Sequence, residues 1–260
     1  MARGVPYAAR RAWIVVVLSL VWLIAGSFLA ADRPPPQLFT APAGEVDPVL
    51  PADRAPAHPR MVFLGDSWGE GAGSERSGGG LADQVALAQG WRLINASRGG
   101  TGYVTGLPSG SSDSAPLPDR VVTVVAKAPD VVIVAAGFSD AARGYTEERI
   151  RDGVERTLRS LRAQLPEAAV YVIGPFWNNG YPADSALLVD QVVAETAAAL
   201  ELPYISPIAQ RWITGSRMRA DPGNGVAYIG PESTNPSQSG HDLLAGLITD
   251  WLASVAVSSR

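Results

Sequence analysis

Residues 61–71 read MVFLGDSWGEG, and this stretch indicates a strand that runs into a glycine-rich turn. Met61–Leu64 is an uninterrupted apolar run, as expected of a strand that is covered on both faces. The next residues, Gly65-Asp66-Ser67, place a hydroxyl on a strand-to-helix turn, where helix-terminal N–H groups can stabilise an oxyanion. Read alone, such a tripeptide is more often an ordinary turn. The stretch therefore predicts the first unit of an α/β fold, with Ser67 as a candidate nucleophile.

The same alternation of apolar runs and amphipathic segments continues along the chain. The predicted strands are Met61–Leu64, Trp91–Asn95, Val131–Ala136, Val170–Gly174 and Tyr204–Ile205. The predicted helices are 81–89, 119–127, 146–165, 184–200 and 238–257. The clearest of them places Ile150, Val154, Leu158, Leu161 and Leu165 on one stripe. This pattern is typical of a three-layer α/β/α fold of the flavodoxin-like kind, with a five-stranded parallel sheet.

The N-terminal 31 residues have the pattern of a membrane segment. Residues 1–11 contain three arginines and no acid, and residues 12–31 are uncharged and apolar. Twenty helical residues span roughly 30 Å, the thickness of a bilayer core. The segment ends in Phe28-Leu29-Ala30-Ala31, which lacks a small-x-small cleavage site. We therefore expect a single-pass transmembrane helix in the cell membrane, with residues 1–11 in the cytoplasm and the remainder extracytoplasmic. The alternative is a cleaved signal segment and a secreted protein.

Residues 32–59 contain eight prolines and little periodic apolar pattern. Such a stretch favours an extended, semi-rigid linker over a helix or a central strand. The folded domain is therefore predicted to occupy residues 60–260.

Composition excludes several classes of function. Lys and Arg number 21 against 25 Asp and Glu, for a net charge of −4, so the chain has no basic excess for nucleic acid. There is no cysteine, and the two histidines are His58 and His241. Thiol nucleophiles and metal sites rich in thiolate or imidazole are thus excluded, and we expect neither a metal nor a cofactor.

Four loops of the predicted fold carry chemistry, since ligands of open α/β sheets bind beyond the carboxyl ends of the strands. They are Gly65–Gly71, Asn95–Tyr103, Gly137–Asp140 and Glu232–His241. In order and spacing these loops resemble the four sequence blocks of the SGNH, or GDSL-type, hydrolases, which are serine esterases, lipases and carbohydrate deacetylases. The resemblance covers residues 60–257.

The resemblance implies a role for particular residues. Ser67 takes the position of the nucleophile. The backbone N–H groups of Ser67 and Gly100, with Gly99 as an alternative to Gly100, and the side chain of Ser139 take the positions of the oxyanion hole. Asp66, Asp140 and His241 are supporting residues.

Three positions depart from the family pattern. The Asn of the third block is Ser139, the Asp of the last block is Glu232, and the catalytic His is Asn235. The last departure is the severe one, because an amide cannot accept a proton near neutral pH. In other serine hydrolases, losing the base lowers turnover on the order of a millionfold.

The sequence offers few substitutes for the missing base. His58 precedes the first strand and is expected at the opposite end of the sheet from Ser67. His241 is expected to bond locally at the start of the last helix, and Asp66 and Glu232 are carboxylate alternatives. Two functions follow. One is an envelope-anchored serine hydrolase, of impaired activity, that acts on a small-molecule ester, a lipid or an acylated glycan. The other is an inactive member of the fold that serves as a binding or scaffold module.

Overall fold

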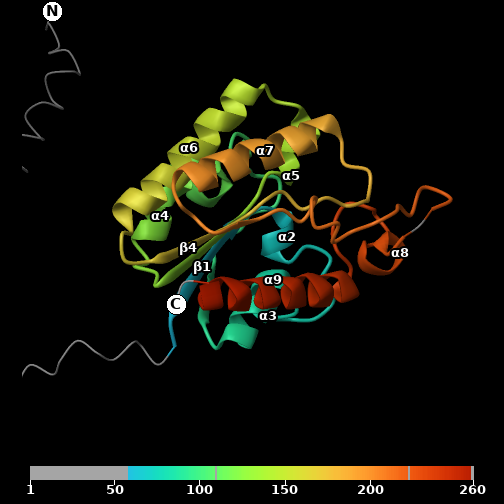
Figure 1. The fold of residues 1–260 in the computed structure, drawn as a ribbon, viewed down its shortest axis with the longest axis horizontal. Coiled ribbons are helices and arrows are strands. Elements are labelled where there is room, and N and C mark those ends of the chain that lie inside the picture. Colours follow the sequence, from blue (N-terminus) through green and yellow to red (C-terminus); the bar gives the residue numbers. More distant parts are fainter. Residues whose placement is uncertain (1–57, 109, 222, 259–260) are drawn as a thin grey trace, which may run out of the picture. The chain divides into compact units, whose positions relative to one another are not determined.

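The computed structural model describes residues 58–258 apart from residues 109 and 222, all within one compact unit, Asp53–Arg260. Its centre is a five-stranded sheet in the order β2-β1-β3-β4-β5, and every neighbouring pair is parallel (Figure 1). The strands are β1 (Arg60–Gly65), β2 (Arg92–Asn95), β3 (Val131–Ala135), β4 (Ala169–Ile173) and β5 (Tyr204–Ile205). The predicted parallel sheet of five strands is thus confirmed.

Helices cover both faces of this sheet (Figure 1). On one face lie α4 (Leu117–Val125), α6 (Glu147–Gln164) and α7 (Asp184–Ala199), and on the other lie α3 (Leu81–Gln89) and α9 (Gln238–Ser258). Side chains of β1 alternate between the two resulting cores, with Val62 and Leu64 in one and Met61 and Phe63 in the other. Every residue of β3 is buried, because the central strand is covered on both sides.

The short helices α2 (Ser67–Glu70) and α5 (Phe138–Arg143) were not predicted, and both follow strands directly. Helix α2 begins where the Asp66 side chain accepts the backbone N–H of Trp68 at 3.1 Å. It ends after one turn at Gly71, whose φ of +94° suits glycine. A 3₁₀ turn at Ser112–Ser114 and the short α8 (Gly225–Tyr228) complete the elements. Sequence periodicity cannot reveal helices this short, since they hold too few residues to form a stripe.

The predicted span 12–31 and the linker up to residue 57 lie outside the described residues. Within residues 58–258, no helix has the length and apolar composition needed to cross a bilayer.

Candidate active site

The first and last predicted loops meet at the carboxyl end of β1. Ser67 is the first residue of α2, and its Oγ donates a hydrogen bond to Oδ1 of Asn235, 2.9 Å away. The loop around Asn235 is held by its own carbonyl, which accepts the N–H of Gly230 at 2.8 Å. It is also packed tightly against the segment that follows α2, because a Cβ added to Gly73 would lie 2.1 Å from the carbonyl oxygen of Pro236.

This pairing orients the Ser67 hydroxyl without activating it. The amide oxygen of Asn235 accepts the hydrogen bond, but it has no protonation equilibrium near neutral pH that could remove the proton. Glu232 is exposed and makes no hydrogen bond to Asn235 in the described structure. Its carboxyl group lies instead against the backbone of Gly230, where both oxygens would be 2.7 Å from an added Cβ. The two positions are therefore not arranged as a base and its orienting acid.

Neither histidine approaches Ser67. His58 Nδ1 lies 3.2 Å from the carbonyl oxygen of Gly90, two residues before β2 and so at the amino end of the sheet. His241 is fully buried, accepts the N–H of Leu81 on Nδ1 at 3.1 Å, and places Nε2 3.0 Å from the carbonyl oxygen of Ala72. Burial lowers the pKa of His241, and these two bonds fit the neutral ring. Its imidazole joins the loop after α2 to α3 and α9.

Asp66 connects the first and third loops. Its carboxylate is buried and accepts the N–H groups of Trp68 at 3.1 Å and Phe138 at 3.3 Å. Burial raises the pKa of Asp66 to about 7, an effect that these two hydrogen bonds partly oppose. Because both carboxyl oxygens are engaged by backbone, Asp66 supports the turn that carries Ser67.

Asp140 connects the third and second loops. This buried carboxylate accepts backbone N–H groups from Tyr103 (2.6 Å), Val104 (3.1 Å) and Thr105 (2.9 Å) and the hydroxyl of Thr105 (2.8 Å). Asp140, the residue after Ser139 in the third loop, therefore holds the second loop against the end of β3.

The candidate oxyanion donors of the second loop are its glycines, Gly99 and Gly100. Gly99 lies against Ser67, since a Cβ added to it would be 3.4 Å from Ser67 Cβ, but its N–H is donated to Glu70 Oε2 at 2.7 Å. Gly100, with φ +77°, has no hydrogen bond on its N–H among the described residues. Ser139 is partly exposed and its hydroxyl likewise has no bond there. Gly100 is thus the freer of the two backbone donors.

Two residues of this region were missed by sequence reasoning. Glu70 holds the second loop through Gly99 and through an ion pair with Arg98 at 3.2 Å. Arg120 of α4 is buried and donates to Thr101 Oγ1 at 3.0 Å and to the carbonyl of Ala96. The signal for Glu70 was its place one helical turn after Ser67, on the same side of a helix. No periodic pattern marks Arg120, which lies on the buried face of α4.

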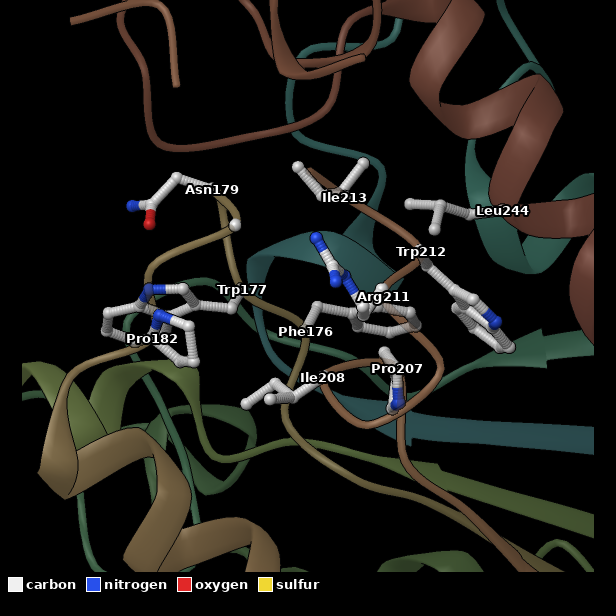
Figure 2. A pocket seen from close by; sticks show the side chains of 11 residues that line it. Phe176, Trp177, Asn179, Pro182, Pro207, Ile208, Arg211, Trp212, Ile213 and Leu244 are labelled. Atoms are coloured by element: carbon white, nitrogen blue, oxygen red, sulfur yellow. The ribbon is translucent and has the colours of Figure 1, made fainter. Parts of the chain in front are cut away.

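A pocket lies between the loops after β4 and β5 (Figure 2), and aromatic rings join it to the nucleophile turn. The ring of Trp68 stacks on Phe176 with centroids 5.1 Å apart, and Phe176 lies 6.3 Å from Trp212. Phe138 lies 5.3 Å from Trp177. The residue after Ser67 and the pocket therefore share one aromatic cluster.

Comparisons with known proteins agree with this geometry. The family model for the GDSL-like Lipase/Acylhydrolase family matches residues 63–243. No curated protein matches the chain. A psychrotrophic esterase EstA from Pseudoalteromonas sp., solved with monoethylphosphonate, is similar with a TM-score of 0.57 at 14% identity, over 76% of this chain and 98% of that one.

Two further solved structures are similar. An acetyl xylan esterase, Est2A, from the rumen bacterium Butyrivibrio proteoclasticus gives a TM-score of 0.54 at 17% identity, over 78% of this chain and 66% of that one. A two-domain esterase active on acetylated mannans gives 0.53 at 21%, over 76% and 50%. At these identities the structures show a shared fold. Since the family model spans most of the described domain, from β1 to α9, the chain belongs to the GDSL-like lipase/acylhydrolase family.

Proposed function

We propose that this protein is a GDSL-type hydrolase that binds ester or acyl groups at Ser67 and turns them over slowly. The observation that carries the proposal is the 2.9 Å hydrogen bond from Ser67 Oγ to an amide oxygen, in the place where a base is required. The hydroxyl is positioned, but its proton has no acceptor that can keep it.

Binding of the acyl group is supported by the parts of the site that remain. Ser67 lies at the N-terminus of α2, the Gly100 N–H is unpaired among the described residues, and Asp66 and Asp140 hold the surrounding loops. An oxyanion of a tetrahedral adduct would accept from backbone donors in this position. We infer a small-molecule ester, a lipid or an acylated glycan as ligand, in line with the esterases of similar fold.

We also propose that the domain is anchored in the cell membrane through residues 12–31 and lies outside the cytoplasm. The support is the uncharged run, the preceding arginines and the absence of a small-x-small site at the end of the run, residues 28–31. Carbonate extraction of membranes from the producing cell tests the anchor: we expect the intact chain in the membrane pellet. A soluble mature form that begins near Ala31 or Asp32 would refute the anchor.

A second candidate, a binding module without turnover, is favoured by the engagement of His241 with Ala72 and Leu81 and by the separation of Glu232 from Asn235. Labelling with a fluorophosphonate, which requires an activated serine, distinguishes the two. Slow labelling that is abolished in Ser67→Ala supports the impaired hydrolase. Complete absence of labelling, in a protein shown to be folded by its thermal transition, supports the binding module.

A further inference from the structure

The pocket next to the aromatic cluster is formed by two loops that leave the sheet at its carboxyl edge. Phe176 and Trp177 come from the loop after β4, and Ile208, Arg211 and Trp212 come from the loop after β5 (Figure 2). This edge is where open α/β sheets bind their ligands. The cavity volume is about 30 Å³, room for about one or two water molecules and therefore for a small polar group, but not for a sugar ring.

Arg211 is the charged residue of this pocket, and no acidic residue lines it. Its guanidinium makes no ion pair or hydrogen bond with any described residue. In Figure 2 the side chain extends into the middle of the pocket, between Ile213 and the ring of Phe176. Arg211 is exposed, so the pocket has one unpaired positive charge that is open to solvent and lies beside apolar and aromatic walls.

The backbone of Arg211 has a left-handed conformation that closes a turn. Arg211 ends a turn in which its N–H donates to Ile208 O at 3.0 Å and the N–H of Trp212 donates to Pro207 O at 3.1 Å. These are the two bonds of a Schellman motif, and Arg211 occupies the left-handed position, with φ +53°, that such motifs usually give to glycine. The arginine is thus held in a conformation that glycine would adopt without strain.

The pocket is also linked to the nucleophile. Phe176 lines it and stacks on Trp68, the residue that follows Ser67, with ring centroids 5.1 Å apart. Both rings are buried, so this link runs through the core. The loop after β4 also contacts the loop that holds Asn235, because the Asn178 side-chain amide donates to the carbonyl of Ser233.

We propose that this pocket is a carboxylate subsite, in which the Arg211 guanidinium binds the carboxylate of an acyl ligand whose reacting group lies at Ser67. The subsite rests on the proposed function for the placement of the acyl group, but binding of the carboxylate does not involve Ser67. A planar guanidinium matches a carboxylate in a two-pronged hydrogen-bonded pair. A single cation suits a monoanion better than a phosphate dianion.

The test is a titration of the full-length chain with hexanoate and with its uncharged analogue hexanamide. The readout is the indole N–H resonances of Trp177 and Trp212, assigned with Trp177→Phe and Trp212→Phe. We expect saturable shifts with hexanoate, and an affinity for hexanamide that is lower than that for hexanoate by about tenfold or more. The substitution Arg211→Gly should weaken hexanoate binding by about tenfold or more. Arg211→Lys should retain only part of the binding, because lysine keeps the charge but lacks the planar fork.

Two controls keep the result interpretable. Arg211→Gly relieves a positive φ, so its thermal midpoint should equal or exceed that of the wild type, and lost binding then cannot reflect unfolding. Arg162→Gln removes the same charge from the surface of α6 and should leave binding unchanged. Equal binding of hexanoate and hexanamide, an unaffected Arg211→Gly variant, or no saturable shift would each overturn the subsite. Saturable binding without fluorophosphonate labelling would leave the subsite intact and count against the hydrolase.

Discussion

The substitution Asn235→His, alone and with Glu232→Asp, should convert the resting Ser67 hydroxyl into a nucleophile. Residue 235 already faces Ser67, with 2.9 Å between the Asn235 amide oxygen and Ser67 Oγ. An imidazole at this position can take the hydroxyl proton during attack and return it to the leaving group.

The expected gain is smaller than the full contribution of a catalytic histidine. A positioned general base contributes about 10²- to 10⁴-fold. Imidazole Nε2, however, lies about 1 Å farther from Cβ than an amide oxygen does, and a misplacement of that size can cost about 100-fold. The close contact of Gly73 with Pro236 limits how far the loop can retreat on that side. We therefore expect a gain of up to about 100-fold in kcat/KM for Asn235→His. Glu232→Asp should add less than about fivefold, because residue 232 is exposed.

The assay is hydrolysis of p-nitrophenyl acetate, with fluorophosphonate labelling in parallel. Each variant is also made with Ser67→Ala, which must remove the gain if it arises at this site. The gained activity should fall below about pH 6.5, as the new imidazole becomes protonated.

Two results would refute the reasoning. Strong wild-type turnover that disappears in Ser67→Ala would show that the site already has a base. A folded Asn235→His, Glu232→Asp protein with no gain in rate would show that the loop does not present residue 235 in a reactive geometry.

Three further predictions concern the buried groups that support the site. Because burial raises the pKa of Asp66 to about 7, ionised Asp66 destabilises the fold increasingly between about pH 4 and pH 7; the thermal midpoint of Asp66→Asn relative to wild type should therefore be higher at pH 8 than at pH 5. Asp140→Ala leaves three backbone N–H groups unpaired and should lower the free energy of unfolding in urea by about 3–5 kcal/mol, with Asp140→Asn losing less. His241→Phe, made in the Asn235→His background, should lower the free energy of unfolding by about 2–4 kcal/mol, because two backbone groups lose their partner. It should leave the gained hydrolysis rate of the folded protein unchanged. Loss of that rate without loss of stability would contradict a purely structural role of His241.

The fold could be predicted from sequence because its signals are local and repeated. Runs such as VVIVA at 131–135 are apolar on both faces, and the stripe from Ile150 to Leu161 has helical spacing. The local pattern of each element therefore predicts which of its faces is buried. The predicted ends of strands and long helices lie within two residues of those in the structure. One-turn helices such as α2 carry no such periodicity.

The candidate site was only partly predictable, for a physical reason. The meeting of Ser67 and Asn235 was implied by the resemblance of their two loops to sequence blocks of the family. Which backbone N–H each carboxylate accepts does not follow, because Asp140 and Glu70 act across loops whose path has no periodic signal. The Arg211 guanidinium could not be placed either, since a left-handed φ at an arginine has no sequence signature.

The cover that α9 provides over one face of the sheet has a consequence for how the chain is made. Phe63 and Ile133 pack with Leu244 and Ile248 in one core, although about 180 residues separate Phe63 from Leu244. At 5–20 residues per second, a ribosome needs roughly 9–36 s to add that length of chain. During this time the apolar side chains of β1 and β3 on that face await their last partner, which favours aggregation of nascent chains. Because this apolar surface stays exposed until α9 is made, we expect the yield during expression to depend on holdase chaperones. Translation is slower at a lower growth temperature, which lengthens the exposure.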